Sequence, residues 1–211
     1  MPAHLLLEVE LGVPCVLFTI GHSTRSLTDF LALLSAYGIE VLVDVRAFPI
    51  SQRYPHFSQK ALAQALEARG IAYVWLGKEL GGYRRTGLGE ASPNKAWGSQ
   101  GFRNFADHML DEGFKRDAEK VVSLAKEKRV ALLCAERFWW RCHRRLIADW
   151  LVAQGHRVIH IVDLGRTVEH KLPPFAQVNG GQVTYPGAES WGPGCGKPSC
   201  KRGVREEKRG A

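Results

Sequence analysis

The 211-residue sequence contains no apolar run of about 18 residues, so no transmembrane helix and no membrane partner are expected. Its N-terminal apolar stretch lacks a preceding basic segment and a small-residue cleavage site, and Glu8 and Glu10 interrupt it, which argues against a secretory signal. The five cysteines are odd in number and scattered, so a disulfide framework is not expected either. These absences predict a cytoplasmic protein with free thiols.

Common phosphate-binding and hydrolase motifs are also absent. No Gly-x-x-x-x-Gly-Lys-Ser/Thr loop occurs, and no Gly-x-Gly-x-x-Gly follows the first apolar run. Ser23 lies near the end of that run, but no Gly-x-Ser-x-Gly sequence surrounds it. The sequence therefore identifies no cofactor and no familiar nucleophile motif.

The composition is that of an ordinary globular protein, with 45% hydrophobic and 24% charged residues. The formal net charge of +8 is uneven, because residues 196–211 hold six basic and two acidic residues. We expect residues 14–187 to form a single domain and residues 188–211 to form a disordered basic tail. Such a tail could also attract nucleic acid without sequence preference.

Apolar runs alternate with amphipathic stretches along the chain. Strands are expected at 15–20, 40–45, 71–76, 129–134 and 157–162. Helices are expected at 26–37, 58–69 and 140–154, and in a region from about 101 to 128 that is broken near Gly113. This alternation predicts an α/β fold of three layers around a mostly parallel, Rossmann-like sheet of five strands.

Two further segments have their own patterns. Asn179-Gly180-Gly181 supplies turn residues for a small C-terminal hairpin over residues 177–185. The 24-residue connection from 77 to 100 is polar and Gly-rich, and it is longer than ordinary connections in compact domains. Connections of that length are usually lids or binding loops, or are partly disordered.

Polar side chains follow each of the first four expected strands. They are His22 and Ser23 after the first, Asp44 and Arg46 after the second, Tyr83, Arg84 and Arg85 after the third, and Glu136, Cys142, His143 and Arg144 after the fourth. Parallel strands end at the same edge of a sheet, where open α/β sheets bind their ligands. We expect these side chains to line one crevice.

The candidate catalytic residues are Asp44, Glu136, Cys142, His22 and His143. Asp44 or Glu136 would move a proton with the help of a histidine, and Cys142 is a candidate nucleophile. Structural alternatives stay open, because Asp44 could form a buried pair with an arginine and Cys142 could be a small core residue. Neighbouring helical residues diverge by about 100°, so Cys142 and His143 are not expected to pair with each other.

Arginines are the candidate ligands for an anion. Guanidinium groups match phosphate oxygens, which makes Arg46, Arg84, Arg85 and Arg144 candidate substrate-binding residues. Ser23 and Tyr83 are candidates beside them. The leading prediction is an enzyme that acts on a nucleotide, a nucleic acid or another phosphorylated substrate, and the alternative is a noncatalytic nucleotide or nucleic-acid binding module.

A third alternative is a metalloprotein that uses Cys134, Cys142 and His143. Their Cys-x₇-Cys-His spacing is not a standard zinc pattern, so we assign no metal ligand from the sequence. Cys195 and Cys200 form only a single Cys-x₄-Cys pair, which is weak support for a zinc site.

Aromatic residues cluster before the last expected helix and in the long connections. Phe138, Trp139 and Trp140 could stack on a base or a sugar, but packing of the turn against the sheet is the commoner use of such aromatics and is expected first. Tyr54, Tyr83 and Trp97 are better placed to stack on a base or a sugar, because no periodicity requires their burial.

Several of these segments resemble one family. They are residues 18–24 (Phe-Thr-Ile-Gly-His-Ser-Thr), 43–46 (Val-Asp-Val-Arg) with Pro49, 80–82 (Leu-Gly-Gly), and 133–136 (Leu-Cys-Ala-Glu) with 142–144 (Cys-His-Arg). In this order and spacing, from about Val16 to Ile161, they resemble the domain-of-unknown-function family 488. The resemblance implies a compact α/β domain of the prokaryotic cytoplasm and leaves the reaction open.

Overall fold

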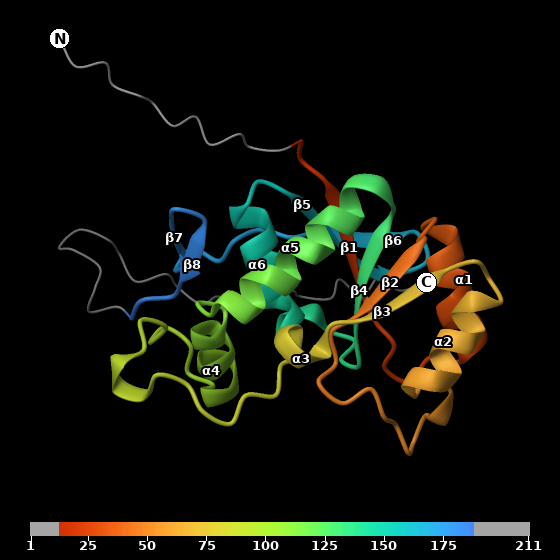
Figure 1. Cartoon of the computed structure of the whole chain (residues 1–211), viewed down its shortest axis with the longest axis horizontal. Coiled ribbons are helices and arrows are strands. Elements are labelled where there is room, and N and C mark those ends of the chain that lie inside the picture. Colours follow the sequence, from red (N-terminus) through yellow and green to blue (C-terminus); the bar gives the residue numbers. More distant parts are fainter. Residues whose placement is uncertain (1–12, 188–211) are drawn as a thin grey trace, which may run out of the picture.

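The computed structural model describes residues 13–187; the expected basic tail, Cys195 and Cys200 lie outside the described residues. A six-stranded sheet in the order β3-β2-β4-β1-β5-β6 forms its centre (Figure 1). The strands are β1 Val16–Gly21, β2 Val41–Asp44, β3 Ala72–Trp75, β4 Val130–Cys134, β5 Arg157–Asp163 and β6 Arg166–Glu169. The first five are parallel, as the alternating pattern predicts, and β6 adds an antiparallel edge strand.

Helices cover both faces of the sheet. Helices α1 Leu27–Ala36 and α2 Gln59–Glu67 lie on one face, whereas α4 Gln100–His108, α5 Glu112–Glu127 and α6 Arg144–Ala153 lie on the other side (Figure 1). Side chains alternate along each strand, so Leu42 packs in the core beneath α1 and α2 while Val41 and Val43 pack in the other. The central strands are buried on both faces, which confirms the expected α/β fold.

The C-terminal hairpin is present as predicted. It pairs β7 Gln177–Asn179 with β8 Gln182–Thr184 through Gly180 and Gly181, whose φ angles of 57° and 77° favour glycine. The buried Tyr185 follows the hairpin and donates its hydroxyl to the Asp149 carboxylate on α6 at 2.7 Å. The segment after the hairpin is thereby fixed to the α6 side of the molecule.

The long connection after β3 is held to α4 by hydrogen bonds. It begins with the short helix α3 Gly77–Leu80, and its second half is held by Asp107 on α4. The Asp107 carboxylate accepts hydrogen bonds from the side chains of Ser92 and Asn94 and from the amide of Leu88. Trp97 is only 8% exposed and lies beneath the Arg145 guanidinium, so the prediction that Trp97 is a free stacking surface is wrong.

No helix within residues 13–187 is long and apolar enough to span a membrane.

Candidate functional site

The carboxyl ends of β1, β2 and β4 lie together at one edge of the sheet. The strand register places Gly21 beside Cys134 and Asp44 beside Leu133. Beyond the strands, the amides of His22 and Ser23 donate to the carbonyls of Cys134 and Ala135. The chain after β4 is therefore held firmly against the chain after β1.

Glycine at position 21 makes this close approach possible. A Cβ atom there would collide with the carbonyl group of Glu136. Ser23, two residues on, has a positive φ of 49° and serves the turn that leads into α1. The structure thus places Ser23 in a turn rather than on the wall of the cavity described next.

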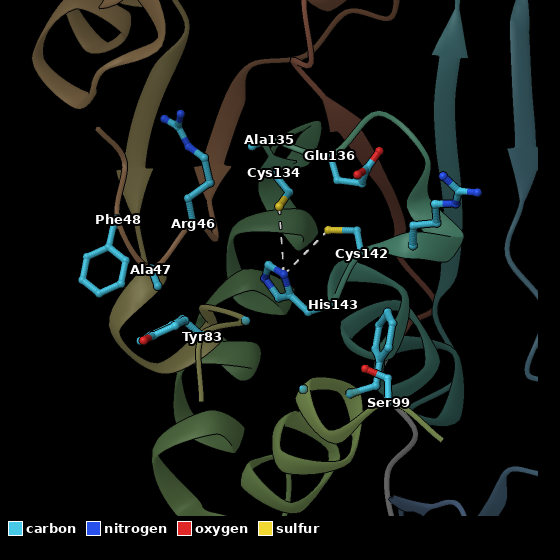
Figure 2. Close-up of a pocket in the computed structure, with 14 residues that line it drawn as sticks. Arg46, Ala47, Phe48, Tyr83, Ser99, Cys134, Ala135, Glu136, Cys142 and His143 are labelled. Atoms are coloured by element: carbon cyan, nitrogen blue, oxygen red, sulfur yellow. Dashed lines mark hydrogen bonds between the residues drawn. The ribbon is translucent and has the colours of Figure 1, made fainter. Parts of the chain in front are cut away.

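An open cavity of about 640 Å³ lies at this edge (Figure 2). Its walls come from residues 46–48 after β2, residues 82–83 after α3, the start of α4, and residues 134–136 and 141–143 after β4. Of the predicted site residues, Arg46, Tyr83, Glu136, Cys142 and His143 line it. His22, Ser23, Asp44, Arg84, Arg85 and Arg144 do not.

Two thiols and an imidazole meet at the cavity. The Sγ of Cys142 lies 3.6 Å from Nδ1 of His143, and the Sγ of Cys134 lies 4.0 Å from the same nitrogen (Figure 2). All three atoms lie within 4.8 Å of one another. Both cysteines are buried, and all three residues contribute to the cavity wall.

The prediction that Cys142 and His143 point apart is wrong. A 3₁₀ turn, Trp139–Arg141, precedes Cys142, and α6 begins only at Arg144. The backbone of Cys142 is extended, with φ −121° and ψ 145°. Because neither residue is inside a regular helix, the helical angle of about 100° between neighbours does not apply.

The imidazole of His143 is oriented by a backbone carbonyl. Its Nε2 lies 3.1 Å from the carbonyl oxygen of Val45, which can only accept a hydrogen bond. The proton therefore belongs on Nε2, and the Nδ1 lone pair faces the two sulfurs. Gly82 packs against the ring so closely that a Cβ atom there would collide with it.

The two thiols have opposite electrostatic surroundings. A hydrogen bond from Cys142 lowers the pKa of Cys134 well below its usual range, and the positive charge of Arg144 acts in the same direction. Burial, together with the neighbouring Cys134, raises the pKa of Cys142. The arrangement favours a thiolate at Cys134, whereas the sequence pointed to Cys142.

Asp44 and Arg46 form a buried ion pair. The guanidinium Nε donates to Oδ1 of Asp44 at 2.9 Å, and the Tyr73 hydroxyl donates to Oδ2 at 2.7 Å. His22 contacts this pair through Arg46, because its Nε2 lies 3.3 Å from the Arg46 guanidinium. Burial, followed by the Arg46 charge, lowers the pKa of His22 to about 4. These contacts favour the structural alternative for Asp44, which holds Arg46 at the cavity wall.

Two of the predicted anion ligands hold the backbone instead. Arg144 is 1% exposed and donates to the carbonyls of Glu136 and Arg137, so it shapes the loop after β4. Arg84 donates to the carbonyls of Lys78 and Glu79 and lines a separate, smaller cavity. Arg85 lines that second cavity as well.

Sequence reasoning missed two features. Arg141 lines the main cavity, and only its position before Cys142 could have indicated this. A buried hydrogen-bonded chain also runs from Thr19 through His160 and His170 to Asp149, with distances of 2.7, 2.9 and 2.7 Å. Its members come from β1, β5, the segment after β6 and α6, so no linear spacing reveals it.

Comparison with known proteins gave one match. Neither the curated proteins nor the solved structures contain a significant match to the sequence. The family model described as "Domain of unknown function DUF488" matches residues 26–151, which is more than half of the chain and includes Asp44, Cys134 and His143. The chain therefore belongs to the DUF488 family.

Proposed function

We propose that this protein is a metal-dependent enzyme in which Cys134, Cys142 and His143 bind a zinc ion at the cavity. The observation that carries the proposal is the approach of their three ligand atoms to within 4.8 Å of one another. Zinc bonds of about 2.3 Å to sulfur and 2.0 Å to nitrogen, at tetrahedral angles, separate the ligand atoms by about 3.5–3.8 Å. The sulfur-to-nitrogen distances of 3.6 and 4.0 Å come near that requirement.

The number of ligands supports a catalytic rather than a structural metal. Structural zinc sites have four protein ligands, whereas catalytic sites keep three and leave one position for water or substrate. Within residues 13–187, no fourth histidine, cysteine or carboxylate joins the group. Zinc held by these three residues at the cavity wall would lower the pKa of a bound water to about 7 and so would supply a nucleophile. Addition of water to a substrate, as in hydrolysis, is the reaction class that follows.

Charged groups on the cavity wall support an anionic substrate, such as a phosphorylated one. Arg141 is exposed and forms no ion pair with any described residue. Glu136 is also exposed, and its Oε1 accepts a hydrogen bond from the Phe138 amide. Arg141 would bind the anion, and the carboxylate of Glu136 would accept a proton.

The proposal requires reduced thiols. Cys134 and Cys142 lie close together, and oxidation to a disulfide would remove two metal ligands. We therefore place the protein in a reducing compartment, the cytoplasm.

Metal analysis of the full chain, purified without an affinity tag, tests the proposal. We expect one zinc per chain in the wild type and in the control variant Cys15→Ser, which removes a buried thiol at the opposite edge of the sheet. Cys142→Ser and His143→Gln should lose the metal while circular dichroism shows a folded protein. Cobalt added to the metal-free wild type should give thiolate-to-metal charge-transfer absorption. Substoichiometric zinc together with absence of this absorption would refute the proposal.

The lowered pKa of Cys134 favours a second candidate, a metal-free thiol enzyme with Cys134 as nucleophile and His143 beside it. The two candidates differ in their response to iodoacetamide at neutral pH. A zinc enzyme should be alkylated only after chelation, because the metal occupies the thiolates. Rapid alkylation of Cys134 in untreated, metal-free protein supports the thiol enzyme.

A further inference from the structure

Two pairs of exposed aromatic rings flank the cavity. Phe48 and Tyr83 are 66% and 57% exposed, and their ring centroids lie 5.6 Å apart; Figure 2 shows both on one side of the Cys–His cluster. Phe138 and Trp140 are 40% and 46% exposed, with centroids 4.8 Å apart. They adjoin the wall that carries Arg141. Large aromatic rings that are exposed to solvent around a cavity indicate a ligand-binding or partner-binding surface.

Each aromatic pair has an arginine over one of its rings. The guanidinium carbon of Arg85 lies 5.7 Å from the centroid of Tyr83, and that of Arg141 lies 5.9 Å from the centroid of Phe138. Neither arginine forms an ion pair in the part of the chain that the structure describes. Two arginines without an ion pair therefore lie beside two ring surfaces, Arg85 at Tyr83 and Arg141 at Phe138.

One wall is rigidly anchored. Trp139, between Phe138 and Trp140, stacks on the buried His160 with centroids 4.1 Å apart and planes 9° from parallel. It also contacts Trp140 edge to face at 5.7 Å. Because Trp139 fixes the turn, its two neighbours are held outward before any ligand arrives, which reduces the entropy lost on binding.

We infer that the mouth of the cavity binds single-stranded nucleic acid. Unpaired bases offer flat π faces that stack on exposed aromatic rings, and the phosphates between them match unpaired arginines. A duplex hides those faces within its own stack, so it cannot use the rings. The inference deepens the proposed function by naming its substrate class. It rests on the proposed function for the reaction itself, since a strand held at both walls would pass across the Cys134–Cys142–His143 cluster.

Fluorescence anisotropy with the full chain tests the inference. The probes are a labelled oligodeoxythymidine of about 16 nucleotides, the upper end of the site size for one binding groove, and a duplex of equal length. The single strand should bind more tightly than the duplex. Tyr83→Ala and Trp140→Ala should each weaken its binding by roughly 5- to 150-fold, the loss expected for one stacked base. Arg141→Ala should lower the slope of log affinity against log salt by about one.

Matched variants away from the cavity control for nonspecific effects. Val178→Ala truncates an exposed hydrophobic residue on β7, and Arg69→Ala removes an exposed charge after α2, at the opposite edge of the sheet. Both should bind the strand within about twofold of the wild type, since any contribution of the basic tail is common to all variants. Equal affinity for duplex and single strand, or unchanged binding in both Tyr83→Ala and Trp140→Ala, would overturn the inference.

The same experiment separates this inference from the proposed function. Protein stripped of metal by a chelator should still bind the strand, because the rings and arginines lie outside the metal site. Strand binding by a protein that never takes up zinc supports this inference and rejects the metal enzyme. A zinc-loaded protein with no measurable strand binding supports the metal enzyme and rejects this inference.

Discussion

Acid should destabilise this protein through one buried histidine, His160. Its side chain is 1% exposed and belongs to the chain of hydrogen bonds that ends at Asp149. With both imidazoles neutral, the Thr19 hydroxyl donates to Nδ1 of His160, and Nε2 of His160 donates to Nδ1 of His170. A proton added to Nδ1 of His160 would face the Thr19 hydroxyl and would break this sequence of donors and acceptors.

The size of the effect follows from the pKa of His160. Burial lowers that pKa from 6.5 to about 2, and the positive charges of Arg144 and Arg145 act in the same direction. Between these pH values the unfolded chain binds a proton that the folded protein does not, so stability falls as the pH falls below 6.5. At about 1.4 kcal/mol per pH unit, the loss is about 3 kcal/mol at pH 4.5 and about 6 kcal/mol near pH 2.

Urea unfolding monitored by tryptophan fluorescence between pH 7 and pH 4.5 measures this loss. The variant His160→Gln keeps one acceptor and one donor but cannot titrate, so its stability should fall by about 3 kcal/mol less than that of the wild type over this range. The reasoning fails if the two proteins show the same dependence of unfolding free energy on pH. It also fails if the wild type loses no stability below pH 6.5.

Three further predictions concern single substitutions. Arg144→Met leaves the Glu136 and Arg137 carbonyls without their buried donor and should cost about 2–5 kcal/mol in urea unfolding, whereas Arg166→Met on the exposed β6 should cost no more than about 0.5 kcal/mol. Gly82→Ala should displace the His143 ring and lower the zinc content of the purified protein; unchanged zinc would contradict the assigned contact. Tyr185→Phe removes a donor from the buried Asp149 carboxylate and should cost about 1–3 kcal/mol; a stability equal to wild type would show that this hydrogen bond contributes little.

The central strands were predictable from the sequence because both of their faces are buried. β4 is therefore a continuous apolar run between Arg129 and Glu136, and β2 is apolar up to Asp44. The edge strand β6 was not predictable, since all four of its residues are exposed and its composition is mostly polar. β6 forms because the turn after β5 returns the chain antiparallel to β5, where it pairs with that strand at the edge of the sheet.

The candidate site was predictable as a region but not as a set of contacts. The carboxyl edge of a parallel sheet brings Arg46, Glu136 and His143 together whatever the details of the loops. The pairing of Cys142 with His143 depends on where a 3₁₀ turn gives way to a helix, and a boundary of one or two residues decides it.

The burial of the aromatic side chains was also not predictable from the sequence. Trp97 was expected on the surface and is buried, whereas Phe138 and Trp140 were expected first to pack the turn and are 40% and 46% exposed. Of that group only Trp139 packs inward, onto His160. Outside helices and strands, sequence periodicity carries no information about burial, so tertiary contacts alone decide which ring faces water.

The hydrogen bond from His143 to the carbonyl of Val45 affects which substitutions this site can accept during evolution. Main-chain carbonyls persist through every substitution, so the hydrogen bond that orients the His143 ring survives any replacement at position 45 that preserves the path of the chain after β2. Glycines 21 and 82 are the opposite case, because a single added methyl group at either one displaces its surroundings. Replacements at Val45 should therefore leave the orientation of His143 intact and act only through the packing of this fully buried side chain, whereas an added methyl group at either glycine should disturb the site directly.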